Sequence, residues 1–400
     1  MITVESLRFL QSDTGADLLA ELATTDLAEA ATLQLLTRLR KRYSPDNAAA
    51  ALETARLRIK GREKLGNSVD RMFFTREALE QASHHAISRS VHVGSFDGYD
   101  RVADLGCGIG ADTIHLAAQH AVVAVDLDPV RLLMAQSNCA ALDHDSAAFI
   151  RADLSRDLPF ANVRAAFFDP ARRANGKRIF SVKDYHPSLA VIHQWPFAAL
   201  TIKLSPGVDL KELDAYGGKV NFVSLNGDLK EALLCTGLRA SKQATQATVI
   251  TYHDAEQIEQ IEVLENDQLA APPLRNPCGY LYEPDPAVIR AGLLSELAIR
   301  LGIEMYRLDE SIAYLTADTH VVSPLARAWI IDDWMPFNLK KLRAYLREHG
   351  IGRVTVKKRG SPITPEELIA QLKLPGGGLE GVIVLTHVAG QPAVLICRTL

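Results

Sequence analysis

The chain has 400 residues, a formal net charge of −4, 48% hydrophobic residues and 23% charged residues. Its length exceeds what one compact core usually supports and indicates two or three domains of ordinary globular composition. The net charge excludes a polycation, so any contact with nucleic acid requires a local basic patch. The five scattered cysteines form no CxxC pair, which argues against a disulfide framework or a zinc site, and we expect no metal.

The N-terminal sequence lacks the basic segment and apolar run that mark a signal peptide. No stretch approaches the roughly 20 apolar residues that cross a bilayer. We therefore expect a cytoplasmic protein without a membrane partner.

Residues 1–88 are expected to form an N-terminal helical domain. Ser44 and Pro45 provide a hydroxyl cap and a proline at the first helical position, which predicts a helix start. The alanine-rich run that follows extends this helix to about residue 66. No strand pattern occurs before residue 88.

From residue 89 short apolar runs alternate with amphipathic helical stretches. The runs that predict buried strands are VADLG, VVAVDLD, AAFIRAD, AAFFDP and LTIKLSP. Strands that alternate with helices predict a parallel sheet covered on both faces. The later runs KVNFVSL, EALLCTG and ATVITYH are expected to close the sheet with an antiparallel hairpin. We therefore expect an α/β domain with a doubly wound, Rossmann-like sheet over residues 89–265.

Five prolines between residues 272 and 286 predict a domain boundary. We expect residues 266–324 to be a linker or small α+β segment. Residues 325–400 contain the helical run NLKKLRAYLREHG and the strand-like runs RVTVKK, GVIVLTHV and PAVLICR. This pattern predicts a C-terminal α+β domain.

The most informative segment is RVADLGCGIGADTIHLA, residues 101–117. A strand ends at Asp104, and Gly106, Gly108 and Gly110 follow before a helix begins. Glycines permit a sharp turn and let a ligand lie against the backbone. The spacing is GxGxG, whereas dinucleotide sites carry GxGxxG. The Asp104 carboxylate suits a positively charged ligand group, such as an amino-acid ammonium, better than a pyrophosphate.

Two further acids follow the next strands. Asp126 ends the second strand, where it can accept hydrogen bonds from two ribose hydroxyls while Leu127 packs on an adenine. Asp153 follows the third strand, where it can accept from the adenine amino group while Leu154 packs nearby. All lie at carboxyl ends of strands, in the crevice that open parallel sheets use for ligands.

DLGCGIG, VDLDP and RADL resemble the successive cofactor motifs of class I S-adenosylmethionine (SAM)-dependent methyltransferases, over residues 101 to about 170. The resemblance implies the methyltransferase form of the sheet, SAM as cofactor and methyl transfer as activity. The cofactor contacts that it implies are Asp104, Gly106, Cys107, Gly108, Gly110, Asp126, Leu127, Asp153 and Leu154.

The preceding segment DRMFFTREALEQAS resembles one that closes over the methionine end of SAM in trimethylguanosine-synthase-like enzymes. This resemblance implies Phe74 and Thr75 as further cofactor contacts. The alternative is that Phe73 and Phe74 belong to a hydrophobic core.

The fourth strand ends in AAFFDPARR. Asp169, Pro170 and Arg172 stand where amino-group methyltransferases carry an acid or amide, a proline and an aromatic residue. A carboxylate and a backbone carbonyl that accept the two hydrogens of an exocyclic base amine favour its pyramidal geometry and take developing positive charge. We therefore expect Asp169 and the Pro170 carbonyl to be catalytic. Arg172 replaces the aromatic residue and can stack on a base or bind a phosphate.

The DPAR loop also resembles the DPPR loop of uracil-C5 RNA methyltransferases. Those enzymes need a cysteine on the next strand, where this chain has Ser205, so carbon methylation is not expected. Lys203 on that strand either reaches the crevice or forms a strand-end salt bridge.

Residues 325–400 resemble the THUMP-like domain that accompanies some bacterial methyltransferases, mainly through VTVKKRGSPITPEEL. THUMP domains generally bind RNA, which implies RNA as a partner and Lys357, Lys358 and Arg359 as RNA contacts. The alternative is a solvated charged face without a ligand.

The leading hypothesis is a methyltransferase that acts on an exocyclic base amine of RNA, with guanine N2 among the candidates. A small-molecule methyltransferase is the first alternative, and it predicts a closed apolar pocket over Asp169. A catalytically inactive SAM- or RNA-binding protein is the second. The sequence identifies neither the RNA, the base and the methylated atom, nor the oligomeric state.

Overall fold

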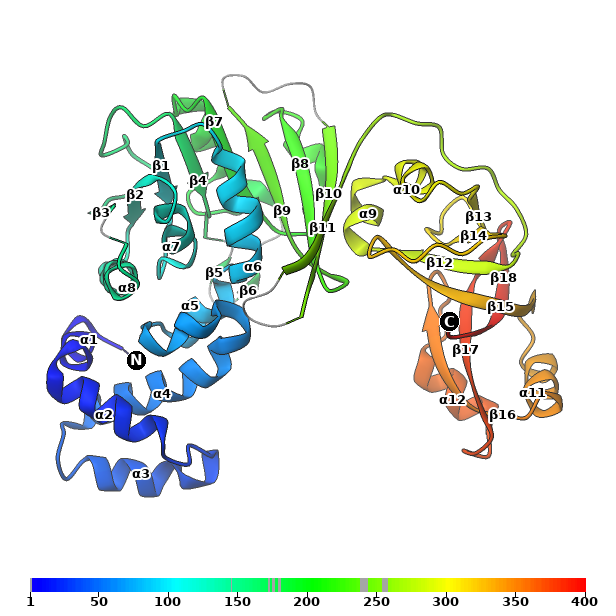
Figure 1. Cartoon of the computed structure of the whole chain (residues 1–400), viewed down its shortest axis with the longest axis horizontal. Helices are drawn as coiled ribbons and strands as arrows, with labels where there is room; N and C mark the ends of the chain where they lie inside the picture. The colour runs from blue at the N-terminus through cyan, green and yellow to red at the C-terminus, as the bar shows by residue number, and fades with distance from the viewer. Residues whose placement is uncertain are drawn as a thin grey trace. The chain divides into compact units, whose positions relative to one another are not determined.

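The computed structural model describes residues 2–144, 146–171, 173–174, 177–178, 181–237, 244–253 and 258–400. The chain divides into two compact units (Figure 1). The first comprises Met1–Asn221, Lys230–Ala244 and Tyr252–Gln260. The second comprises Phe222–Leu229, Thr245–Thr251 and Ile261–Leu400.

The N-terminal segment is helical, as its sequence predicts. The longest helix, α4, begins after Ser44, whose side chain accepts a hydrogen bond from the Asn47 amide, and Pro45 is its first residue. It ends before Gly66, which has a φ of +74° that residues with a Cβ rarely adopt. The helices of this segment are α1 (Val4–Gln11), α2 (Asp13–Ala23), α3 (Thr32–Leu39), α4 (Pro45–Leu65), α5 (Arg76–Gln81) and α6 (His85–Ile87).

These helices share a hydrophobic core with α7 (Ala111–Ala117) and α8 (Pro129–Ala141), which connect the first three strands of the sheet. Leu7, Leu57 and Phe74 belong to the same buried cluster as Ile114 and Met134. Figure 1 shows the blue N-terminal helices close to α8 and α5. The change at residue 88 is therefore a change in secondary structure within one packed body.

The large sheet has nine strands in the order β11-β10-β8-β9-β7-β4-β1-β2-β3. Strands β7, β4, β1, β2 and β3 are parallel to one another, and β9 runs antiparallel to β7. The predicted parallel sheet with antiparallel closing strands is confirmed. The strands are β1 (Arg101–Leu105), β2 (Ala121–Asp126), β3 (Ala147–Arg151), β4 (Ala165–Phe168), β7 (Ala199–Leu204), β8 (Lys219–Leu225), β9 (Asp228–Thr236), β10 (Ala244–Tyr252) and β11 (Ile258–Glu265).

Burial of the central strands explains their apolar sequences. All four residues of β4 are buried, as are five of the six residues of β7. Because parallel strands end at one edge, the segments that follow β1, β2, β3 and β4 meet there. A short antiparallel pair, β5 (Arg173–Ala174) and β6 (Lys177–Arg178), follows β4.

The second unit contains a mixed seven-stranded sheet in the order β13-β14-β12-β15-β18-β17-β16. Only the pair of β16 and β17 is parallel. The expected linker 266–324 contributes three of these strands. The elements are β12 (Tyr280–Pro284), α9 (Pro286–Ala291), α10 (Leu294–Leu301), β13 (Tyr306–Arg307), β14 (Leu315–Ala317), β15 (Ala326–Pro336), α11 (Leu339–Glu348), β16 (Ile351–Lys358), α12 (Pro365–Leu372), β17 (Leu379–Val388) and β18 (Gln391–Arg398).

Helices α11 and α12 bury leucines against one face of this sheet, in contact with side chains of β17 and β18. The predicted helix at 338–350 and the predicted strands at 353–358, 381–388 and 392–398 are confirmed as α11, β16, β17 and β18. The C-terminal α+β architecture follows the sequence pattern.

Candidate functional site

A cavity of about 1130 Å³ lies at the carboxyl edge of the parallel strands of the first unit. Its wall comes from the loops after β1, β2, β3 and β4, from β7 and β9, and from α4 and the segment 78–87. Pockets for small ligands have volumes of about 300–1,000 Å³. This cavity therefore has room for a nucleoside cofactor and part of a second substrate.

The glycine loop after β1 forms one side of the cavity. Gly106 has a φ of +80°, and a Cβ on it would lie 2.6 Å from the backbone oxygen of Asp169. A side chain at this position would thus push the loop after β4 away. Gly110 has a different task, because its Cβ would lie 3.0 Å from the Ala135 Cα and would separate α7 from α8. Cys107 and Gly108, which lie between these two glycines in the sequence, line the cavity.

Asp126 at the end of β2 is held by two backbone amides. Its Oδ2 accepts from the Gly108 N–H at 2.8 Å, and its Oδ1 accepts from the Asp128 N–H at 2.8 Å. Burial raises the pKa of Asp126, although these hydrogen bonds oppose the shift. Leu127 beside it is 58% exposed and lines the cavity. An oriented carboxylate thus stands next to an accessible apolar side chain.

Asp153 and Leu154 line the cavity after β3. Asp153 accepts hydrogen bonds from the Ser155 amide at 2.9 Å and from its hydroxyl at 2.6 Å. These bonds lower the pKa of Asp153. The carboxylate is therefore ionised and half-buried, while Leu154 is buried.

Four predicted cofactor contacts lie outside the described lining of the cavity, namely Phe74, Thr75, Asp104 and Gly110. Phe74 is fully buried in the N-terminal core, and Thr75 caps α5 by accepting from the Ala78 amide at 3.1 Å. Asp104 accepts from the Thr113 hydroxyl at 2.5 Å, and burial, followed by the charge of Asp112, raises its pKa to about 8. These residues therefore stabilise the segments that form the cavity wall without lining the cavity themselves.

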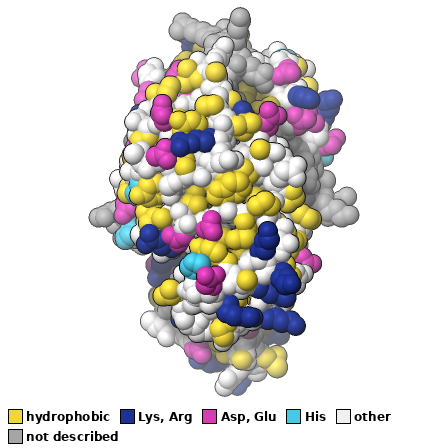
Figure 2. Space-filling view, turned by 90° about the vertical axis from the view of Figure 1, so that its right-hand side faces the viewer, with side chains coloured by type: hydrophobic (Ala, Val, Ile, Leu, Met, Phe, Trp, Pro, Cys, Tyr) yellow, Lys and Arg dark blue, Asp and Glu magenta, His cyan; other side chains and the backbone are white. Residues whose placement is uncertain are grey.

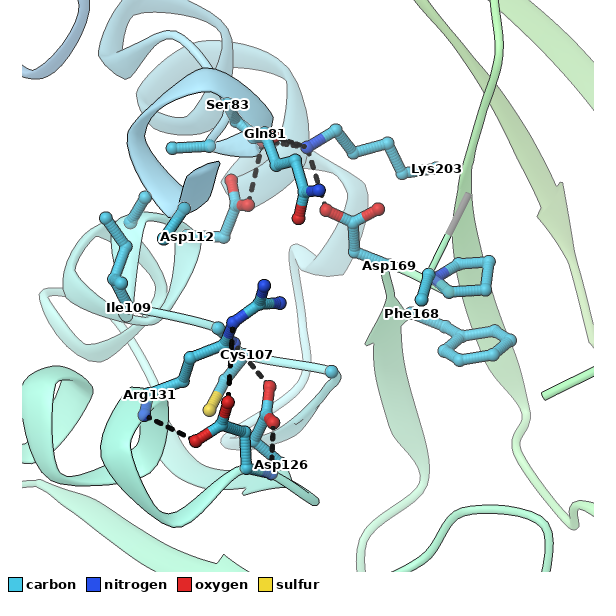
Figure 3. A pocket seen from close by; sticks show the side chains of 18 of the residues that line it. Gln81, Ser83, Cys107, Ile109, Asp112, Asp126, Arg131, Phe168, Asp169 and Lys203 are labelled. Carbon is cyan, nitrogen blue, oxygen red and sulfur yellow. Dashed lines mark hydrogen bonds and ion pairs between the residues drawn. The ribbon is translucent and has the colours of Figure 1, made fainter. Parts of the chain in front are cut away.

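Asp169 follows β4, and Lys203 on β7 faces it (Figure 3). The Lys203 ammonium donates to Asp169 Oδ2 at 2.8 Å, to Ser83 Oγ at 2.8 Å and to the Gln81 carbonyl at 3.3 Å. The Lys203 side chain is 3% exposed and that of Asp169 is 22% exposed. The sequence left two possibilities open for Lys203, and the structure combines them, because Lys203 both lines the cavity and forms the salt bridge.

The rest of the DPAR loop follows Asp169 into the cavity wall. Pro170 and Ala171 line the cavity. The Ala171 amide donates to the His186 carbonyl at 3.0 Å, and the His186 amide donates back at 3.1 Å. Arg172 lies outside the described residues.

Several charged residues near Asp169 were missed by the sequence analysis. Asp112, at the start of α7, and Glu231, on β9, both line the cavity, and the imidazole of His92 lies between their carboxylates. Glu231 was detectable as an acid within the apolar strand sequence EALLCTG, because an ionisable residue in a buried strand needs a partner. No sequence signal marks His92.

The three predicted RNA contacts at the end of β16 have different surroundings. The Lys357 ammonium donates to Glu283 Oε2 at 2.7 Å and lies 4.6 Å from the centre of the Trp329 ring. Arg359 lies 3.7 Å from the other oxygen of Glu283. Lys358 is exposed, as the alternation of side chains along a strand requires. Only one of the three predicted cations therefore lies fully on the surface.

Figure 2 shows one face of the molecule on which Lys and Arg side chains gather below a band of hydrophobic side chains. In the second unit the exposed cations of the α11–α12 region are Lys340, Lys341, Arg347, Arg353, Lys358 and Lys373.

Comparison with known proteins places these features in a family. Residues 102–173 match the methyltransferase domain family, residues 326–399 the THUMP domain-like family, and residues 3–61 a domain of unknown function, DUF8688. Two Mycobacterium tuberculosis proteins named uncharacterized S-adenosylmethionine-dependent methyltransferases, MT3122 and Rv3037c, are each 32% identical over 374 residues. The matches cover 90% of this chain and 99% of each relative. The chain belongs to this family of SAM-dependent methyltransferases.

A solved structure confirms the fold of this methyltransferase. The crystal structure of a protein from Porphyromonas gingivalis W83, which is provisionally named a methyltransferase, superposes on this chain with a TM-score of 0.74. It is 20% identical in sequence, and the alignment covers 96% of this chain and 98% of that protein. The class I fold, the enzymatic activity and the SAM cofactor expected from the sequence are thus confirmed.

The described residues contain neither a candidate membrane span nor a candidate metal site. None of the helices among them is long and apolar enough to cross a membrane. The same residues contain no group of three or more His, Cys, Asp or Glu side chains arranged to hold a metal ion.

Proposed function

We propose that this enzyme transfers the methyl group of SAM to an exocyclic amine of a base in RNA, with guanine N2 as the leading candidate. One observation carries the proposal. The Asp169 carboxylate lines the cavity directly beside the glycine loop, since the Asp169 backbone closes on Gly106. An acid in this position accepts an N–H of an amine that approaches the methyl group.

The wall after β1, β2 and β3 supports a cofactor pose. The open backbone of Gly108 and the exposed face of Leu127 fit a nucleoside. We propose that Asp126 accepts the ribose hydroxyls and that Asp153 and Leu154 contact the adenine. We assign indirect roles to Phe74, Thr75, Asp104 and Gly110, which keep this wall in place.

SAM, when bound, supplies a methyl group on a positively charged sulfur. The acceptor nitrogen forms the new bond with its lone pair as the methyl–sulfur bond breaks and leaves its electrons on sulfur. Asp169 and the Pro170 carbonyl accept the two amine hydrogens, which orients the lone pair and balances the positive charge on nitrogen. The nitrogen then releases one proton to the solvent through the cavity.

The cavity lining supports a nucleotide over an apolar small molecule. Near Asp169 it contains Lys64, Lys203 and Lys230 along with several acids. A closed apolar pocket, which the small-molecule alternative predicts, lacks such charges. The THUMP domain-like match of residues 326–399 and the exposed lysines of the second unit further support RNA. Among the three predicted RNA contacts, Lys358 is the one that we retain as a direct phosphate contact.

A hydroxyl acceptor is a second candidate, favoured by Lys64. Burial first, and then the charge of Lys203, lower the pKa of Lys64 to about 8. A lysine that is partly neutral near physiological pH can accept the proton of a hydroxyl group. A hydroxyl acceptor must lose this proton during transfer, whereas a base amine keeps its hydrogens until the methyl group has been transferred. The Lys64 ammonium also donates to the carbonyls of Leu79 and Glu80 at the end of α5.

Transfer of labelled methyl from SAM to total RNA tests the proposal, with protein and metabolite extracts in parallel. Nucleoside analysis of labelled RNA then distinguishes an N-methylated base from an O-methylated ribose. Asp169→Ala is expected to abolish transfer while the affinity for S-adenosylhomocysteine stays within about twofold. Asp153→Ala is the contrasting variant, because it removes a proposed adenine contact from the same cavity: it is expected to weaken binding of S-adenosylhomocysteine and to retain transfer at saturating SAM. Label confined to small molecules would reject the RNA substrate, and active Asp169→Ala enzyme would reject the role of Asp169.

A further inference from the structure

A continuous row of hydrogen bonds runs along the cavity wall of the first unit and passes through the buried His92. Ser83 Oγ lies 2.8 Å from Lys203 Nζ and donates to Asp112 Oδ2 at 2.8 Å. The other oxygen of Asp112 bonds His92 Nδ1 at 2.7 Å, and His92 Nε2 bonds Glu231 Oε1 at 2.5 Å. The row, which we call the charge array, consists of Asp169, Lys203, Ser83, Asp112, His92 and Glu231.

The side chains of the charge array are largely buried, although five of its six members, all except His92, line the cavity. His92 and Glu231 have side-chain exposures of 0% and 4%, and Lys203 has 3%. An unpaired charge in such surroundings is strongly destabilising, because it has lost its hydration. The order of carboxylate and cation alternates along the array, so each interior charge has opposite charges on both sides.

The protonation of His92 completes this alternation. Burial alone would lower the pKa of His92, but Glu231 and then Asp112 outweigh it and raise the pKa to about 10. Burial would likewise raise the pKa of Asp112, but His92 and then Lys203 lower it well below its usual range. At neutral pH the array therefore contains an imidazolium between two carboxylates. The groups that face His92 are Asp112 and His115 of α7, Glu231 of β9 and the Phe167 ring of β4.

The members of the array come from separate parts of the fold. Asp112 lies in the first turn of α7, directly after the glycine loop, and Asp169 lies in the loop after β4. Lys203 and Glu231 come from the adjacent strands β7 and β9. The array thus connects the element that carries the cofactor loop with the loop that carries the candidate catalytic acid.

We propose that Lys203, His92 and Glu231 are positioning residues, which fix the direction of the Asp169 carboxylate beside the glycine loop. This inference rests on the role of Asp169 in the proposed function. It also bears on substrate class. The fixed ammonium of Lys203 repels a second cation at Asp169, so the site favours a neutral acceptor, such as a base amine, over an alkylammonium group.

Glu231→Gln is the main test, because it keeps the shape of Glu231 and removes one of the two charges that hold His92 protonated. In the variant His92 is expected to titrate between pH 6 and 9, whereas in the wild type it stays protonated across this range. Nuclear magnetic resonance of histidine-labelled protein measures the titration of His92 in the variant and in the wild type. As His92 loses its proton, kcat is expected to fall about tenfold, while the KM for SAM changes less than twofold.

Substitutions of Lys203 provide a second test of the proposal. Lys203→Met is expected to lower kcat at least tenfold without weakening the binding of S-adenosylhomocysteine, and Lys203→Arg is expected to restore part of the rate because it returns the charge. The double variant Lys203→Met/Asp169→Asn removes both charges and should fold more stably than Lys203→Met alone, because no unpaired Asp169 charge remains. Equal kcat in Lys203→Met and wild type would overturn the proposal.

Failure of the RNA hypothesis can be distinguished from failure of this inference. If wild-type enzyme labels an acceptor other than RNA, the kcat measurements are made on that acceptor. Crystal structures of Glu231→Gln with S-adenosylhomocysteine at pH 6 and pH 9 need no acceptor at all. An Asp169 carboxylate that keeps its wild-type position at both values, while His92 titrates, would refute the positioning role.

Discussion

The substitution Gly106→Ala tests the contact between the cofactor loop and the catalytic loop. The added Cβ would lie 2.6 Å from the backbone oxygen of Asp169, whereas ordinary contact begins at 3.4 Å, so the two segments must separate by about 0.8 Å. The φ of +80° adds a conformational cost of about 1–2 kcal/mol for a residue with a Cβ. Both effects act on the segment that holds the candidate catalytic acid.

We expect Gly106→Ala to lower kcat on the order of 100-fold, because a misplacement of about 1 Å near the reacting atoms costs a rate factor of this size. The assay is transfer of labelled methyl at saturating SAM. Thermal denaturation of the same preparation reports the conformational cost separately.

Gly108→Ala is the matched control. Gly108 also has a positive φ, of +57°, but no atom lies within 4 Å of its added Cβ. Gly108→Ala therefore has the conformational cost of a positive φ but makes no contact with Asp169. Its added Cβ faces the cofactor cavity. We expect it to raise the KM for SAM more than it lowers kcat. An equal loss of kcat in both variants would refute the contact argument.

Four further predictions concern other parts of the chain. Asp126→Ala should weaken binding of S-adenosylhomocysteine by a factor on the order of 10 to 100 in calorimetry, because charged hydrogen bonds are lost. From about pH 4 to 8 the folded chain holds a proton on Asp104 that the unfolded chain releases, so stability falls as pH rises through this window. Asp104→Asn should flatten that fall in thermal denaturation at pH 5 and 8. Glu283→Gln should destabilise the second unit by about 1–2 kcal/mol, because it removes the partner of Lys357 and Arg359. Ser44→Ala should cost about 1 kcal/mol through loss of the α4 cap, measured by denaturation.

The first three of these predictions can each be contradicted by a specific outcome. Unchanged affinity of Asp126→Ala would remove Asp126 from the ribose contacts. A pH dependence of Asp104→Asn equal to that of the wild type would mean that Asp104 is ionised when folded. Lys358→Ala is the control for Glu283→Gln, because Lys358 is exposed: it should weaken RNA binding and leave stability unchanged. Loss of stability in Lys358→Ala, together with unchanged stability in Glu283→Gln, would contradict the different surroundings assigned to Lys357 and Lys358.

The elements and the cofactor motifs were readable from the sequence because they depend on local patterns. The strands β1 to β4 and β7 are short apolar runs, and the start of α4 is visible as Ser44 followed by Pro45. Parallel strands bring their carboxyl ends to one edge, so the segments with Asp126, Asp153 and Asp169 were expected in one crevice, and the cavity joins them.

The role of each glycine and the direction of each cation were not readable, because they depend on neighbours distant in sequence. Gly106 and Gly110 look alike in the motif, but one closes on the loop after β4 and the other on α8. Lys357 and Lys358 are adjacent in the sequence, yet a partner 74 residues away holds only the first.

The sequence by itself determined the methyltransferase fold and its cofactor, because strand periodicity and the glycine loop are local features. Tertiary structure alone decided the surroundings of Asp169. Lys203 meets Ser83 across 120 residues of chain, and His92 meets Glu231 across 139. Such pairs form because a buried charge must find an opposite charge wherever the fold brings one within reach, and no local pattern records where that is.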